Sequence, residues 1–302
     1  VCALDFWNKP GSEVLGSAKG KACVGDANGQ GTLSQFCGLS AFPHLTFLSA
    51  NRAGEDAYAG AVGVDWVQAS TSRGMTQLTV PKYLELVHAA QPDVFDALSD
   101  PVPVLQKPAP SARLAHLLDQ TAETCSEIAS KPGGTSAVHN TAKRASQSVD
   151  RTIRWLDLQL DAMENLQWKR CPRLFAVVQG AGELDQRIRC AAAVAARAKN
   201  RATGVVGIAG FSLGGFGLGE STAARLPLVE ACVRELEAAA PSKPRLLPLA
   251  GGAAGGGPRA VLEAVSAGID LFESAYPLHA TTNDRALCWP NALPQLSATE
   301  EA

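Results

Sequence analysis

The sequence predicts an α/β fold in which short buried strands alternate with helices around a parallel sheet. From residue 174 onward, strand, glycine turn and helix recur every ~20–40 residues, which is the rhythm of a parallel sheet. The strands read as continuous apolar runs, as expected when both faces of a sheet are covered. The last strand ends at Glu273, and the carboxyl ends of parallel strands are where such folds carry their chemistry.

The composition is that of a soluble globular protein with enough apolar material for a large core. The chain has 302 residues, of which 46% are hydrophobic and 19% charged, so it fits one large domain or two ordinary ones. A net charge of −2 gives no global reason to expect nucleic-acid binding. No apolar run of about 18 residues predicts a membrane span. Eight widely spaced cysteines form no CxC or CxxC pair, which favours reduced thiols over disulfides or zinc.

The N-terminal half is the less regular part of the chain. Residues 1–70 are rich in Gly, Ala and Ser and are expected to be irregular. Pro81 opens a predicted helix, since proline is favoured in the first helical turn. Further elements are expected as a strand at 94–98, a helix at 111–130, a loop at 131–135 and a long helix at 143–167.

The C-terminal half supplies the regular alternation. The apolar runs predict strands at 174–178, 205–213, 245–249 and 269–272, and the intervening periodic segments predict helices at 183–199, 221–240 and 258–267.

The residues just past these strands define a candidate site. They are Gln179, Gly214-Gly215, Gly251-Gly252 and Glu273. Glycines allow a flat ligand to approach the backbone, and a glutamine amide both donates and accepts hydrogen bonds. The alternative is that the glycines are ordinary turns, Gln179 is a solvated loop residue and Glu273 is a helix cap or surface carboxylate. The residue pattern leaves both interpretations open.

Four ordered motifs, at 175–180, 210–220, 243–246 and 268–273, resemble the tRNA-guanine transglycosylase family. The resemblance covers residues 75–288. It implies a (β/α)8 TIM-type barrel over 71–288, expected to be incomplete in this chain, followed by a tail at 289–302 without the family's zinc-binding part. It also implies exchange of guanine for a 7-deazaguanine base at the tRNA wobble position. Gln91-Pro92-Asp93, Ser148-Val149-Asp150-Arg151 and Leu271-Phe272-Glu273-Ser274 are most similar to the branch of eukaryotic accessory subunits that act with queuine.

The resemblance assigns roles position by position. Glu273 stands where catalytic members have the nucleophilic aspartate, and the extra methylene misplaces the carboxylate. Ser99, or Asp100 if the alignment shifts by one, stands where they have a base-recognising aspartate. No acid/base Asp-Ser-Gly-Gly-Phe-Gln loop occurs at 65–77. Gln179 and Gly214-Gly215 are retained as the remnant of a base pocket. The resemblance therefore implies a subunit that performs no base exchange.

The same resemblance suggests partners. It implies a heterodimer with a catalytic subunit, a tRNA contact at Lys143 and Arg144, and a cytoplasmic location with peripheral association at the mitochondrial outer membrane. Cys288 alone cannot replace the family's zinc ligands, so no cofactor is expected in this chain. Two alternatives remain: a divergent catalytic transglycosylase that attacks through Glu273, and an unrelated barrel enzyme acting on a small molecule.

Overall fold

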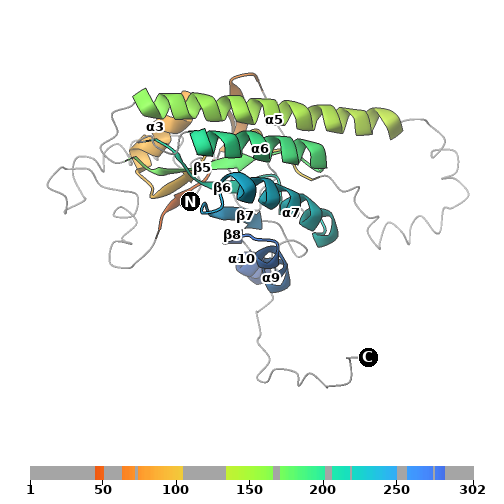
Figure 1. The fold of residues 1–302 in the computed structure, drawn as a ribbon. Helices are drawn as coiled ribbons and strands as arrows, with labels where there is room; N and C mark the ends of the chain where they lie inside the picture. The colour runs from red at the N-terminus through yellow and green to blue at the C-terminus, as the bar shows by residue number, and fades with distance from the viewer. Residues whose placement is uncertain are drawn as a thin grey trace, which may run out of the picture.

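A parallel six-stranded sheet forms the centre of the computed structural model (Figure 1). The structure describes residues 45–50, 63–71, 74–104, 134–165, 171–200, 206–217, 220–249, 257–274 and 276–282. The strand order is β1-β4-β5-β6-β7-β8. The strands are β1 (Phe47–Leu48), β4 (Val94–Asp96), β5 (Arg173–Val178), β6 (Ile208–Leu213), β7 (Arg245–Leu249) and β8 (Leu271–Ser274).

Helices connect the strands and cover the outside of the sheet. They are α3 (Val80–Ala90), α5 (Gly134–Asn165), α6 (Leu184–Asn200), α7 (Thr222–Ala239), α9 (Pro258–Ser266) and α10 (Tyr276–Thr282). Figure 1 shows α5, α6 and α7 lying in succession along one side of the sheet. The main core fills the space between helices and strands, because the buried leucine, valine and alanine faces of the helices meet the outward side chains of β5, β6 and β7.

A second, smaller cluster shows that the sheet curls. Phe47, Val94, Phe175 and Leu246 pack together although they come from β1, β4, β5 and β7. Phe47 and Phe175 meet edge to face with ring centroids 5.8 Å apart. Side chains of such distant strands can touch only on the concave face of a curved sheet. The described strands therefore form a parallel half-barrel, which agrees with the predicted TIM-type fold, although closure of a complete barrel is not among the described features.

An antiparallel hairpin lies outside this sheet. It is formed by β2 (Trp66–Thr71) and β3 (Gly74–Thr79). Trp155 Nε1 on α5 donates to Val64 O at 2.9 Å, which holds the segment before the hairpin against that helix. The boundary expected at residue 70 falls inside β2, and β1, on its N-terminal side, belongs to the main sheet.

Most predicted elements that the structure describes are confirmed to within a few residues. Two differ for identifiable reasons. α5 begins at Gly134, so part of the predicted loop 131–135 is helical. β8 begins at Leu271 rather than at Ile269, because Gly268 takes a left-handed φ of +90° and Arg245 N donates to the Asp270 carboxylate before the ladder starts. The helix expected at 111–130 lies outside the described residues.

No helix in the described part of the chain is both long and apolar enough to span a membrane.

Candidate functional site

The concave face of the half-barrel carries the candidate site at the carboxyl ends of the strands. Its orientation follows from Gly210 in β6 and Gly214 directly after that strand. A Cβ on Gly210 would lie 2.5 Å from the ring of Phe175, and a Cβ on Gly214 would lie 2.9 Å from Val177 Cγ1 and 2.3 Å from Gln179 Nε2. Phe175, Val177 and Gln179 therefore point to the same face. The predicted residue Gln179 lies on the inside of the curved sheet rather than in a solvated loop.

Gln179 is fully buried and joins the other predicted pocket residues. Its Nε2 donates to Ser99 Oγ at 3.2 Å, and its Oε1 has no hydrogen-bond partner. A Cβ on Gly215 would lie 3.2 Å from Oε1, so both glycines keep the amide unobstructed. The structure thus brings together Gln179, Ser99, Gly214 and Gly215, while their role in holding a base remains a prediction.

Asp100, the alternative to Ser99, points elsewhere. Its carboxylate accepts from Arg144 Nη1 at 2.6 Å and Nη2 at 2.5 Å, and from Arg151 Nε at 2.7 Å. Its backbone N–H donates to Thr152 Oγ1 at 3.2 Å. All three partners lie on α5, so Asp100 anchors the loop after β4 to that helix. Ser99 is the residue of this loop that faces the candidate pocket.

Arg187 on α6 fixes the two loops that form the pocket, and sequence reasoning missed it. Its Nε donates to Ala181 O at 2.9 Å, and its Nη1 donates to Val178 O at 3.2 Å and to Gly214 O at 2.7 Å. The guanidinium lies 4.0 Å from the centre of the Phe216 ring. Burial lowers the pKa of Arg187.

The spacing of Arg187 from the apolar residues of α6 could have identified it from the sequence. It lies three, four and seven residues before Cys190, Ala191 and Val194, which form the buried face of α6. An arginine in that phase points into the protein rather than to solvent.

Glu273 lies inside β8, opposite Pro248 on β7. Its side chain is half-buried, and burial raises its pKa. The carboxylate predicted to stand at the family's nucleophile position is therefore on the sheet's last described strand, in surroundings that hinder its ionisation.

Asp96 on β4 is the second carboxylate of the concave face and was not predicted. It is only 7% exposed. Ser49 Oγ donates to its Oδ2 at 3.1 Å, and backbone N–H groups of Ala50 and of Asp96 itself also act on this carboxyl group to favour its charged form. Burial, followed by the negative charge of Glu273, raises the pKa of Asp96 to about 7. Asp96 could have been singled out from the sequence, because it is a charged residue inside the apolar run Val94-Phe95-Asp96-Ala97-Leu98.

The segment 65–77 does not form the strand-end loop that the resemblance suggested. Residues 66–71 and 74–79 build the separate hairpin, and the strand beside β4 is β1. Ser49 and Ala50 therefore follow the strand next to Asp96. The family's acid/base position in this chain must be sought after β1.

Metal ligands are not gathered in the described part of the chain. No group of three or more His, Cys, Asp or Glu side chains there could hold an ion. Cys288 lies outside the described residues. The described residues do not fit the family's zinc site.

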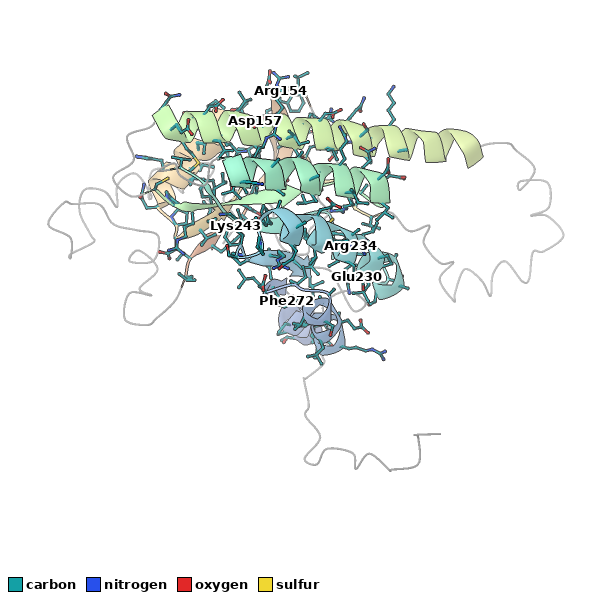
Figure 2. The ribbon with its side chains drawn as sticks, viewed as in Figure 1. Arg154, Asp157, Glu230, Arg234, Lys243 and Phe272 are labelled. Carbon is teal, nitrogen blue, oxygen red and sulfur yellow. The ribbon has the colours of Figure 1, made fainter. Side chains whose placement is uncertain are left out.

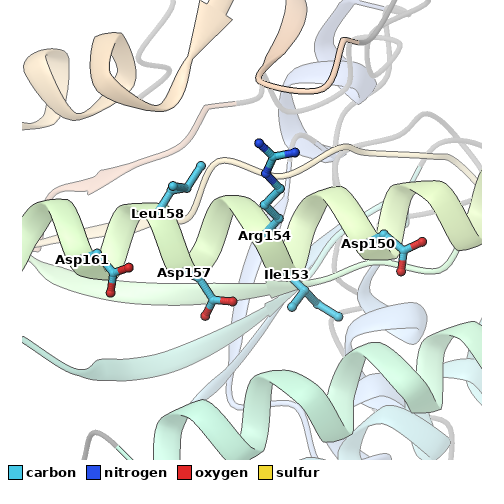
Figure 3. Close-up of a pocket in the computed structure, with 6 residues that line it drawn as sticks. All are labelled: Asp150, Ile153, Arg154, Asp157, Leu158 and Asp161. Carbon is cyan, nitrogen blue, oxygen red and sulfur yellow. The ribbon is translucent and has the colours of Figure 1, made fainter.

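A hollow on the outer face of α5 lies away from this site (Figure 3). In Figure 3 Arg154 and Leu158 point to one side of the helix and Asp157 and Asp161 to the other. Its charged groups are paired: Arg154 with Asp65, Asp150 with Arg189, and Asp157 with Arg197. The complete lining is Asp150, Ile153, Arg154, Asp157, Leu158 and Asp161. Three aspartates make this hollow unfavourable for phosphate groups.

The predicted tRNA-contact residues differ in their surroundings. Lys143 is exposed on α5, whereas Arg144 is bound to Asp100. Figure 2 shows Arg154 and Asp157 on the outer helix layer, well separated from Phe272 next to Glu273. A tRNA contact at Lys143 and Arg144 stays a prediction.

Comparison with protein-family models shows which family the chain belongs to. The family model of queuine tRNA-ribosyltransferase matches residues 133–300, which is more than half of the chain. The chain belongs to this family. The match covers β5 to β8, and with them Gln179, Gly214, Gly215 and Glu273. It also sets aside the alternative of an unrelated small-molecule barrel enzyme.

Curated relatives point to one branch of the family. The chain is similar to "Queuine tRNA-ribosyltransferase accessory subunit 2" of Xenopus laevis, with 31% identity over 72% of this chain and 40% of the relative. The Gallus gallus protein of that name is 27% identical over 72% of the chain and 40% of its own length. The Drosophila grimshawi protein is 29% identical over 89% of the chain and 53% of its own length. The chain thus spans about half or less of these relatives.

Proposed function

We propose that this chain acts as a non-catalytic accessory subunit of a queuine tRNA-ribosyltransferase. It pairs with a catalytic subunit that exchanges guanine for queuine at the wobble position of tRNA, and it performs no exchange itself. The similarity to proteins named accessory subunit 2 supports the pairing. The retained Gln179, Gly214 and Gly215 support descent from a base-binding ancestor.

The properties of Glu273 are the main reason to propose that this chain does not catalyse the exchange. A carboxylate nucleophile must be ionised and placed within a fraction of an ångström of the anomeric carbon. Glu273 is one methylene longer than the family's aspartate, and burial raises its pKa, which works against the ionised form that nucleophilic attack requires. Ser99 in place of the base-recognising aspartate removes a second charged group. Both substitutions lower the catalytic capacity of the same face.

One observation favours the alternative of a divergent catalytic transglycosylase. Asp96 lies within the electrostatic reach of Glu273, and its pKa of about 7 suits a group that donates and accepts protons at neutral pH. In that case Glu273 attacks the ribose C1′, the glycosidic bond to guanine breaks, and Asp96 supplies a proton to the leaving base. The two proposals make opposite predictions for the chain on its own.

A base-exchange assay separates them. Labelled guanine incorporation into tRNA is measured for this chain alone, for the cognate catalytic subunit alone, and for the co-expressed pair. An accessory role predicts no incorporation by the chain alone, activity only with the partner, and unchanged activity of the pair with Glu273→Gln. Incorporation by the chain alone that is lost in Glu273→Gln would establish the catalytic alternative.

The remaining partner and location proposals rest on family similarity. We propose a tRNA contact at Lys143, with a cytoplasmic location and peripheral association at the mitochondrial outer membrane. The tRNA contact is tested by measuring the tRNA affinity of the pair at several salt concentrations, and this affinity should fall with Lys143→Glu. The location is tested by cell fractionation. No step of the proposed function involves a zinc ion.

A further inference from the structure

Helix α9 exposes the large apolar side chains that a surface helix normally buries. Pro258, Leu262 and Val265 follow one another at intervals of four and three residues, so they lie on one face of the helix. Leu262 is 68% exposed, Val265 is 51% exposed, and Pro258 is exposed as well. The buried face of α9 consists instead of two small residues, Ala260 and Ala264. These three side chains, called the apolar stripe of α9 below, are therefore left uncovered by the described residues.

The apolar stripe of α9 is unfavourable in water. Single exposed leucines are common, but several aligned large apolar side chains usually mark a surface that another segment or another protein covers. A stable protein–protein interface takes roughly 800 Å² from each partner, and three side chains on a helix of nine residues cannot supply that area. A short extended segment therefore fits the stripe better than a second folded protein does.

The chain passes beside α9 directly after β8. Figure 1 shows α10 next to α9. A Cβ on Gly257, the residue before α9, would lie 3.5 Å from Cε2 of Tyr276, the first residue of α10. α10 has seven residues and so adds only about 10 Å before it ends at Thr282. Five further residues span up to about 17 Å when extended, so the chain from residue 287 onward can reach the stripe.

The sequence after α10 carries an apolar pattern of its own. Residues 283–302 lie outside the described residues. Their sequence has no charged residue from 286 to 299, and two prolines favour an extended, polyproline II-like backbone for themselves and for the residue before each. That conformation has three residues per turn, so residues three apart share one face. Four large apolar residues recur at this interval: Leu287, Pro290, Leu293 and Leu296.

We propose that segment 287–296 of this chain packs in an extended conformation along the apolar stripe of α9. The leucines of the segment lie against Leu262 and Val265, which removes both apolar surfaces from water. The family model matches residues 133–300, so α9 and the segment belong to the same matched region, which supports a contact within one chain. The contact lies on the outer, helical side of the half-barrel, and it does not depend on the accessory role.

The test is photo-crosslinking from α9 in the full chain. Leu262→p-benzoylphenylalanine places a photoreactive group in the stripe, and mass spectrometry identifies the peptide to which it crosslinks. We expect a crosslink to residues 287–296 in a species that keeps the mass of a single chain. The matched control is Leu158→p-benzoylphenylalanine, because Leu158 is also an exposed leucine and lies on α5, on the far side of the molecule from α9 (Figure 1). It should give no crosslink to the segment.

Two adjacent substitutions test the three-residue interval of the segment. Leu296→Asp places a charge on the proposed contact face, so the crosslinking yield from position 262 should fall about tenfold. Gln295→Asp adds the same charge one position earlier, off that face, and should change the yield by less than about twofold.

Three results would overturn the proposal. The first is the absence of a crosslink from position 262 to residues 287–296 in a folded protein. The second is a crosslink to a second copy of the chain or, in the complex, to the catalytic subunit in place of the segment. The third is an equal loss of yield with Leu296→Asp and Gln295→Asp, since the segment then does not bind through its apolar face.

Discussion

Replacing Asp96 by asparagine should stabilise the protein at alkaline pH and not at acid pH. The fold raises the pKa of Asp96 from 3.8 to about 7, chiefly through burial. The folded state therefore prefers the protonated group. Its contribution to stability is complete below pH ~4, is lost as pH rises from ~4 to ~7, and stays lost above that. At ~1.4 kcal/mol for each tenfold change, the loss amounts to about 4 kcal/mol.

Asparagine stays neutral at every pH and can still accept from Ser49 Oγ through its side-chain oxygen. Its new N–H groups need partners, and an unmet one offsets about 1–3 kcal/mol of the gain. We expect Asp96→Asn to unfold at a higher urea concentration than the wild type at pH 8, by roughly 1–3 kcal/mol in the free energy of unfolding. The advantage should vanish between about pH 4.5 and 6, where the remaining penalty on Asp96 equals the cost of the unmet N–H.

The measurement is urea unfolding at four pH values between 5 and 8, with Glu230→Gln as the control for loss of one exposed charge. A difference between Asp96→Asn and wild type that stays constant over this range contradicts the reasoning. It would mean that the group does not titrate there, and that Asp96 is either ionised with a partner or neutral throughout.

Three further changes test the arrangement of the site. Gly214→Ala places a methyl group 2.3 Å from Gln179 Nε2 and should destabilise the fold by about 1–3 kcal/mol in urea unfolding; an unchanged midpoint would show that Gln179 moves freely. Arg187→Met removes the donors of three buried carbonyls and should lower the unfolding free energy by about 3 kcal/mol, whereas Arg189→Met on the exposed side of the same helix should change it by less than about 1 kcal/mol. Arg144→Ala should weaken the fold by about 1–2 kcal/mol through Asp100, while Lys143→Ala should leave it within about 0.5; equal effects would refute the anchoring role.

The alternation of strands and helices was accessible from the sequence because each element carries its own periodicity. The strands at 173–178, 208–213 and 245–249 are apolar on both faces, and the glycines after them mark their ends. Elements whose conformation depends on contacts with distant residues were harder to predict from the sequence. Whether 131–135 forms a loop or a helix depends on whether α5 extends, and two adjacent glycines argue locally for a loop.

The same distinction explains the candidate site. Gln179, Gly214 and Gly215 follow strands directly, so their common location is a consequence of strand parallelism. Arg144 looked like a free basic side chain because its partner, Asp100, lies 44 positions earlier in the sequence. No local pattern distinguishes a solvated arginine on a helix from one that clamps a distant loop. A basic cluster read from sequence is therefore weak evidence for nucleic-acid contact.

Asp96 shows how the two carboxyl groups depend on one another. Considered alone, Glu273 is a carboxylate near the end of a strand, and Asp96 is a charged residue within an apolar strand. The curl of the sheet places them on one concave face, where the negative charge of Glu273 adds to burial in hindering the ionisation of Asp96. A half-barrel that keeps two such groups without a salt-bridge partner in its described part bears a stability penalty at neutral pH. The concave face as a whole, rather than Glu273 alone, is therefore the region whose pH dependence should be tested.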